Sequence, residues 1–326
     1  MIKTELMILM IVLTVFGPVS FILAEPYSIY DIQYTTDPNG NSPLDGVLIN
    51  ECCGGIVVFK GPSWIRPKLA LYDPNYPDAW GGIMAKDPEG VGVFTDVNVG
   101  DWVSFHNFEV EEYRGTTFLQ YFEENDPCYT IVSRDNPLPQ PLTVHVGQIK
   151  APVEGTLERV VEDHNAEKYE AMLLKVVDVN VDGKEYGKAK DNYILQSNRE
   201  PNSCWASDYM NEDTDGQKYH PLVQLGQRFC GVTGILEQYT GTKSGVYYDY
   251  YQLLTTNTQD FTITQAADCD GDCDVDLADF SVFALYRLQE GCAEPGWCGG
   301  ADLTQNGTVD TLDLAEFLQH WLDGKN

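Results

Sequence analysis

Basic residues are scarce in this 326-residue chain, which has 20 Lys and Arg against 50 Asp and Glu. The formal net charge of −30 repels phosphate backbones, so nucleic-acid binding is not expected. The same excess of carboxylates suits a protein that gathers divalent cations. A hydrophobic content of 43% and an aromatic content of 12% indicate packed cores and exclude a disordered chain.

Recognisable catalytic motifs are also missing. The chain contains no Gly-x-Ser-x-Gly, His-Glu-x-x-His, Walker loop or Gly-x-Gly-x-x-Gly. Its five histidines are scattered, without zinc-ligand spacing. The acid pairs Glu111–Glu112 and Glu123–Glu124 point to opposite faces of a strand, so we expect solvated edges rather than acid–base couples. The sequence therefore predicts a non-catalytic protein.

Long apolar runs are confined to the N-terminus. Lys3 precedes an apolar stretch from Leu6 to Phe16, Gly17-Pro18 interrupts it, and Ala24 is a small residue at a suitable cleavage point. This pattern predicts a secretory signal peptide over residues 1–24. The alternative, a retained membrane anchor, fits less well because the run is short and broken. We expect a secreted or cell-surface protein with no membrane span after cleavage.

Nine cysteines fit an exported, oxidising setting. The count is odd, so at least one thiol is free or bonded to another chain, and the sequence does not determine the connectivity. Cys292 and Cys298 could form one disulfide, and Cys269 and Cys273 are a second candidate pair.

Residues 27–265 alternate apolar stretches with Gly, Pro, Asn and Asp clusters, which predicts strands. A shift of 126 residues aligns "VNVGDWVSFHNFEVEEYRGTT", from Val97, with "VQLGQRFCGVTGILEQYTGTK", from Val223. Two copies of one antiparallel β-barrel domain are expected, residues 25–140 and 141–265. The proline-rich stretch from Asn136 to Val144 suits an extended linker. Each Glu-x-Tyr-x-Gly-Thr segment predicts a strand that ends in a turn.

The segments "YSIYDIQYT", "SPLDG", "VGDWV" and "YEAMLLKV" resemble the tandem OB-like domains of secreted nucleases of the YhcR and extracellular-nuclease type. Ala171 stands where that family favours Gly. The resemblance implies an OB-like fold, but the separate nuclease domain of that family has no counterpart here. Aromatic residues such as those of "YYDYYQ" could stack on glycan rings or pack the barrel cores.

The acidic stretch "DCDGDCDVDLADF" begins a second repeat, of 34 residues. Oxygen ligands at positions 1, 3, 5, 9 and 12, with a backbone carbonyl at position 7, are typical of calcium loops. The first expected site comprises Asp268, Asp270, Asp272, Asp274, Asp276 and Asp279. The second comprises Asp302, Thr304, Asn306, Thr308, Asp310 and Asp313. Cys273 replaces the usual Gly at position 6 of the first loop. The alternative to a calcium fold is a solvated acidic tail.

Each loop is followed by an expected amphipathic helix. The predicted apolar faces are Phe280, Phe283, Ala284 and Leu288, and Leu314, Leu318, Trp321 and Leu322. Two such units resemble a dockerin module over residues 266–326. The resemblance implies two calcium ions and a cohesin-like protein or surface scaffold as partner. The partner-binding residues that it implies are Leu277, Ala278, Leu285, Thr311, Leu312 and Gln319.

The expected fold is thus mainly β, with two OB-like antiparallel β-barrels followed by a small α-helical dockerin-like module. The expected function is calcium-dependent docking of β-domains that recognise a glycan or another protein. A dockerin-bearing enzyme or accessory subunit of polysaccharide degradation is one alternative. A nuclease-accessory protein is another.

Overall fold

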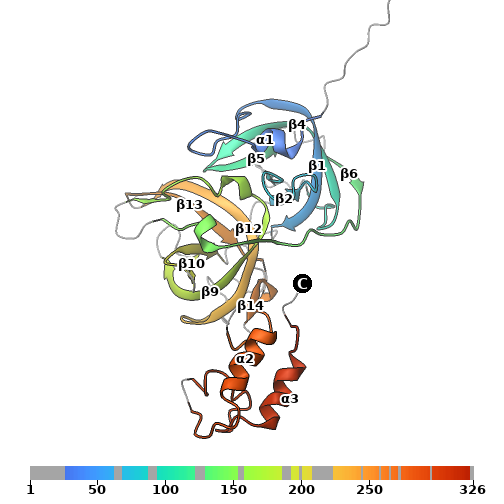
Figure 1. The fold of residues 1–326 in the computed structure, drawn as a ribbon. Helices are drawn as coiled ribbons and strands as arrows, with labels where there is room; N and C mark the ends of the chain where they lie inside the picture. The colour runs from blue at the N-terminus through green and yellow to red at the C-terminus, as the bar shows by residue number, and fades with distance from the viewer. Residues whose placement is uncertain are drawn as a thin grey trace, which may run out of the picture.

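The structure is a computed structural model (Figure 1). It describes residues 26–61, 68–86, 94–121, 129–152, 158–185, 192–197, 200–207, 223–243, 245–256, 258–263, 266–270, 273–293 and 296–323. The expected signal peptide, Glu123–Glu124 and Asp272 lie outside these residues. No helix of the described part has the length and apolarity needed to cross a membrane.

The chain is mainly β and forms two sheets followed by a helical pair (Figure 1). The first sheet contains β1 (Leu48–Lys60), β2 (Lys68–Tyr72), β3 (Gly82–Lys86), β4 (Trp102–Tyr113), β5 (Thr116–Tyr121) and β6 (Tyr129–Ser133). The second contains β7 (Leu142–Val144), β8 (Arg159–Val160), β9 (Leu173–Glu185), β10 (Asn192–Ser197), β11 (Ser203–Ser207), β12 (Arg228–Lys243), β13 (Val246–Leu254) and β14 (Phe261–Ile263). The helices are α1 (Ile29–Gln33), α2 (Leu277–Leu285) and α3 (Thr311–Gln319), and short 3₁₀ turns are η1 (Val146–Gln148), η2 (Glu167–Tyr169) and η4 (Thr258–Asp260).

The two sheets share one pairing order. The first runs β1-β2-β3-β5-β4-β6 and the second contains β9-β10-β11-β13-β12-β14. In each, the first long strand also pairs with the fourth, β1 with β4 and β9 with β12. The pairing β3–β5 of the first sheet is parallel, and so are β11–β13, β7–β9 and β8–β13 of the second, so the expectation of wholly antiparallel domains is wrong.

The repeated segments differ at one turn. In the first copy β4 and β5 meet at Arg114-Gly115, both with positive φ, as expected of a strand ending there. In the second copy Gly241 and Thr242 remain inside β12, which pairs with β13 as far as Lys243. The hairpin of the second copy is therefore longer, and the prediction of a turn at Gly241 is wrong. Ala171 adopts the left-handed conformation, with φ +58°, in place of the glycine of the resembling family.

The two sheets pack directly on each other and are not held apart by an extended linker. Only the part of the proline-rich stretch before Leu142 lacks a strand, because β7 pairs in parallel with β9. A buried cluster is drawn from both sheets. Its members are Phe59, Ala70, Met84, Phe118, Ala171, Ile235 and Leu254. Backbone and ionic contacts cross the same boundary, including Trp80 N–H to the Lys168 carbonyl at 2.7 Å and Lys68 to Glu237 at 2.7 Å.

The C-terminal helical pair has two-fold internal symmetry. The Val275 and Leu322–Asp323 backbones exchange hydrogen bonds of 2.9 and 2.8 Å, and Val309 makes equivalent bonds with Leu288–Gln289. Every residue of one set lies 34 positions from its counterpart in the other. Each loop is thus paired with the segment that follows the helix of the other repeat.

The two small cores of this pair are crossed in the same way. Phe283 of α2 packs with Ala301 and Val309 of the second repeat. Phe317 of α3 packs with Ala267 and Val275 of the first. The two phenylalanine rings lie 5.6 Å apart, which joins the cores.

The helical faces expected from the sequence are partly wrong. Phe283 is buried as predicted, but the buried aromatic residue of α3 is Phe317, which the pattern missed. The helices end at Leu285 and Gln319, so three residues assigned to the faces lie beyond them. These residues, which are exposed, are Leu288, Trp321 and Leu322.

Candidate calcium centre

The first acidic loop gathers its carboxylates. Oxygen atoms of Asp268, Asp270 and Asp279 lie within 4.8 Å of one another, and so do those of Asp274, Asp276 and Asp279. Asp279 belongs to both groups and is fully buried. Each expected ligand of this loop in the described part of the chain therefore belongs to one of two carboxylate groups that share Asp279, and carboxylate oxygens are the ligands that Ca²⁺ takes.

Asp279 and its counterpart Asp313 are held by backbone N–H groups from both sides of their loops. Asp279 accepts from Asp270 N at 3.0 Å and from Asp276 N at 2.7 Å. Asp313 accepts from Thr304 N and from Asp310 N, both at 2.8 Å. Each carboxylate sits in the first turn of its helix and completes a capping box with the residue at position 9. These bonds set the shape of each loop.

The carboxylate at position 1 of each loop accepts a hydrogen bond from the backbone N–H group at position 6. Asp302 accepts from Gly307 N at 2.8 Å and from Asn306 N at 3.0 Å, and Asp268 accepts from Cys273 N at 3.2 Å. Gly307 has φ +94° and Cys273 has φ +78°. The sharp turn that calcium loops make at this position is therefore present in both, although a cysteine occupies it in the first.

The second loop closes on its own polar groups. The Thr304 hydroxyl donates to Asp313 Oδ1 at 2.8 Å, and Asn306 donates to the Thr304 hydroxyl at 2.9 Å. Burial alone would raise the pKa of Asp313, but hydrogen bonds from Asp310 and Thr304 outweigh it and lower the pKa below its usual value. Asp313 is thus an ionised ligand candidate near neutral pH.

The residues implied as partner contacts all lie at the surface. Leu277, Ala278, Leu285, Thr311, Leu312 and Gln319 are each exposed. Leu285 is 81% exposed, Leu277 70% and Leu312 60%. Other exposed apolar residues of the helical pair are Phe280, Leu288, Leu318, Trp321 and Leu322. Exposed apolar side chains are therefore numerous on the helical pair.

Of the two candidate cysteine pairs, one is bonded. Cys292 and Cys298 form a disulfide, which confirms the first pairing and closes the connection between the two repeats. Cys269 and Cys273 are both free thiols, and Cys269 contacts the Gly300 carbonyl oxygen at 3.9 Å.

A buried acidic cluster between the two sheets was not anticipated from the sequence. Glu170 accepts from Thr117 N at 3.0 Å and from Gln33 Nε2 at 3.3 Å, so a residue of the second β-domain is bonded to the first. Glu167 accepts from the Tyr251 hydroxyl at 2.8 Å. Burial, together with the charges of neighbouring acids that include Glu112, raises the pKa of Glu170 and Glu167 well above the usual range.

Glu112 shows why the pair Glu111–Glu112 is not a solvated edge. Its Oε1 accepts from Ser42 N at 2.7 Å and from the Thr117 hydroxyl at 2.6 Å, while Glu111 pairs with Lys86. Both carboxylates are partly buried, so the expectation of solvent exposure is wrong. The two side chains still have separate partners, as their opposite directions on the strand require.

We expect Glu170→Gln to stabilise the paired sheets near neutral pH. The folded chain holds a proton on Glu170 that the unfolded chain releases above about pH 4.5, so stability falls as pH rises from there through the raised pKa. Glu170 Oε2 is also a buried atom that has no hydrogen-bond partner among the described residues. The amide of the variant stays neutral and takes up no proton on folding, so the gain should be about 1.4 kcal/mol for each pH unit above the unfolded-state pKa, up to the raised pKa.

Thermal unfolding at a series of pH values measures the effect. Glu170→Gln should flatten the pH dependence, whereas the exposed control Glu51→Gln should leave it unchanged. An identical pH slope in wild type and Glu170→Gln would show that Glu170 does not carry the protonation.

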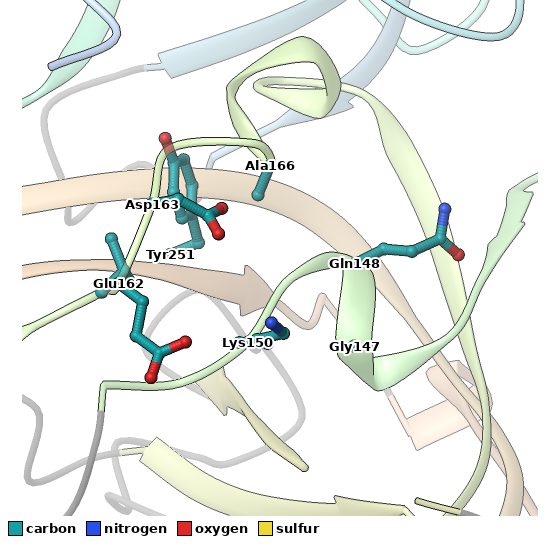
Figure 2. A pocket seen from close by; sticks show the side chains of 8 residues that line it. Gly147, Gln148, Lys150, Glu162, Asp163, Ala166 and Tyr251 are labelled. Carbon is teal, nitrogen blue, oxygen red and sulfur yellow. The ribbon is translucent and has the colours of Figure 1, made fainter. Parts of the chain in front are cut away.

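The hollows of the β-part differ in size. The one in Figure 2 is lined by Gln148, Lys150, Glu162, Asp163 and Tyr251 among others, and its room of about 10 Å³ fits about one water molecule. A wider hollow of about 620 Å³ lies where the two β-domains meet, beside Trp80 and residues 161–168. Tyr34, which is 45% exposed, contacts Trp80 edge-on at 5.5 Å on this side. The wider hollow has room for a ligand larger than water, as does a neighbouring hollow of about 720 Å³ beside Tyr30 and Tyr34.

Comparison with known proteins assigns no family. The chain matches no protein-family model and no curated protein sequence. Among solved structures it is similar to fission yeast Pot1, crystallised with single-stranded DNA, at 13% identity over 65% of this chain and 79% of that chain. The TM-score of that likeness is 0.22, which is too low to carry a conclusion about fold or function.

Proposed function

We propose that this chain is an exported, non-catalytic protein whose C-terminal dockerin-like module binds two calcium ions and attaches two OB-like β-domains to a cohesin-type partner or surface scaffold. The observation that carries the proposal is the symmetry of residues 266–323. In both acidic loops the backbone N–H groups of positions 3 and 9 donate to the carboxylate at position 12, and the N–H group of position 6 donates to the carboxylate at position 1. The cores of the two repeats also cross. A solvated acidic tail would have no reason to bury Asp279 and Asp313 completely.

The ligands that we assign are those expected from the repeat. In the first loop they are Asp268, Asp270, Asp272, Asp276 and Asp279, with the carbonyl of Asp274. In the second they are Asp302, Thr304, Asn306, Asp310 and Asp313, with the carbonyl of Thr308. In the first loop, a bound cation would neutralise carboxylates that lie within 4.8 Å of one another and otherwise repel.

The OB-like assignment of the β-domains rests on strand order. In each domain the first strand pairs with the second, the second with the third, the third with the fifth, the fifth with the fourth, and the fourth with the first. This closed circuit of five strands supports a small OB-like barrel. The domains would be the displayed cargo. Their wider hollow, with Tyr34 and Trp80 beside it, supports a glycan as ligand, since sugar rings stack on aromatic faces without positive charge. The alternative proposals are a dockerin-bearing enzyme or accessory subunit of polysaccharide degradation and a nuclease-accessory protein.

The docking surface of the two repeats is unequal. At position 10 the first repeat has Leu277 and the second has Thr311, and at position 18 the residues are Leu285 and Gln319. Burying a threonine hydroxyl without a partner costs about 1–3 kcal/mol, a factor of about ten or more in affinity. We therefore expect the first-repeat face to dominate partner binding.

Binding of the full chain to a recombinant cohesin domain, in calcium and in chelator, tests the proposal. Leu277→Asp should weaken binding at least about tenfold, and Leu312→Asp should weaken it less. Leu225→Asp, at a leucine that is 65% exposed but lies in the β-part, is the matched control and should bind as wild type. Equal, small losses from the two module variants would sink the unequal-face hypothesis. Binding that survives chelation would contradict calcium-dependent docking itself.

A further inference from the structure

Two thiols that are 43 positions apart in sequence meet where the second sheet touches the first acidic loop. Cys230 is a buried residue of β12, and Cys273 occupies position 6 of the loop. Their sulfur atoms and a carboxylate oxygen of Asp268 all lie within 4.8 Å of one another. The side chains are therefore already directed toward each other.

The backbone conformation at Cys273 indicates that the cysteine side chain has a role at this position. Its φ of +78° is a conformation that glycine adopts readily and that an L side chain adopts only with strain. The equivalent residue of the second loop is Gly307, with φ +94°. A strained residue persists where the surroundings use its side chain. The group that the Cys273 side chain reaches is Cys230, from a different part of the fold.

We propose that Cys230 and Cys273 form a disulfide in the exported protein and so tether the first acidic loop to strand β12. The oxidising setting rests on the proposed export, whereas the pairing rests on geometry alone. Each thiol loses one proton and one electron, and the two sulfurs join at about 2.0 Å. The acceptor is a second disulfide, such as oxidised glutathione, whose S–S bond breaks to give two thiols.

Neither of the other described free thiols competes for this bond. Cys204 is buried in the core of the second sheet, and Cys269 faces the Gly300 carbonyl. The disulfide would fix the position of the helical pair relative to the second sheet. The helical pair lies beside β14, the strand that precedes it in the chain (Figure 1).

Peptide mapping of the full chain tests the pairing. The protein is refolded with a mixture of reduced and oxidised glutathione, alkylated without reductant, digested and analysed by mass spectrometry. The expected product is a peptide pair linked through Cys230 and Cys273 that disappears after reduction. Cys230→Ser and Cys273→Gly should each abolish it, and Cys204→Ser should leave it in place. Cys273→Gly installs the residue of the second loop, so folding of that variant is expected.

Three outcomes would overturn the inference. They are complete alkylation of both cysteines in the oxidised protein, a Cys269–Cys273 pair, or bound Zn²⁺ that protects both thiols until a chelator removes it. Calcium titration of the same sample separates this inference from the proposed function. A linked chain that binds no calcium contradicts the function and leaves the disulfide standing, and an unlinked chain that binds calcium does the reverse.

Discussion

Chelation of calcium should unfold residues 266–323 of the full-length chain and leave the two sheets folded. The module has two small cores, each with three or four buried residues, which is little for a unit of this size. Its first loop also holds carboxylates within 4.8 Å of one another. An ion that binds only the folded form adds about 2.7 kcal/mol at one hundred times its Kd, for each site. Without the ion, repulsion between the carboxylates acts on a module whose small cores contribute little stability.

Far-UV circular dichroism and limited proteolysis would follow the change. Loss of the helical signal and cleavage within the module in chelator, both reversed by calcium, are the expected results. The unfolding midpoint of the β-part is the internal control and should not move. Helicity and protease resistance that persist in chelator would show that the module needs no metal.

The second large effect is expected from Phe317→Ala. Phe317 is fully buried and packs on Ala267, Val275 and Phe283. Truncation of such a phenylalanine costs about 3–5 kcal/mol. That loss is comparable to the stabilisation that calcium supplies through two sites at one hundred times its Kd, so the unfolding midpoint of the module should fall sharply even in calcium.

Leu318→Ala is the matched control for this variant. Leu318 is the next residue of α3 and is 59% exposed, so its truncation should change stability by no more than about 0.5 kcal/mol. Thermal unfolding in calcium compares the two. Equal midpoints for Phe317→Ala and Leu318→Ala would disprove the crossed core.

The acidic loops could be predicted from the sequence because their geometry is local. Positions 1, 6, 9 and 12 interact within twelve residues, and Asp279 and Asp313 occupy the capping positions that spacing requires. The buried face of α3 could not be predicted in this way. Phe317 is buried against Ala267 and Val275, which belong to the other repeat, so helical periodicity alone does not identify it.

The same distinction applies to the β-part. Alternation and repetition predicted two strand-rich units, but the end of β12 depends on its partner β13, which pairs as far as Lys243. Glu170 carries no local signal either. It is buried because Thr117 and Gln33, from the first β-domain, close over it. Tertiary packing decides both features.

The crossed cores of the C-terminal module have a consequence for its origin. Phe283 fits among Ala301 and Val309, and Phe317 among Ala267 and Val275. A single 34-residue unit would thus leave its own phenylalanine exposed and its own loop uncovered. Two identical units could complete each other by reciprocal exchange, as the subunits of a two-fold symmetric homodimer do. The present module has the form of such a dimer joined into one chain, with the segment that contains Cys292 and Cys298 as the joint.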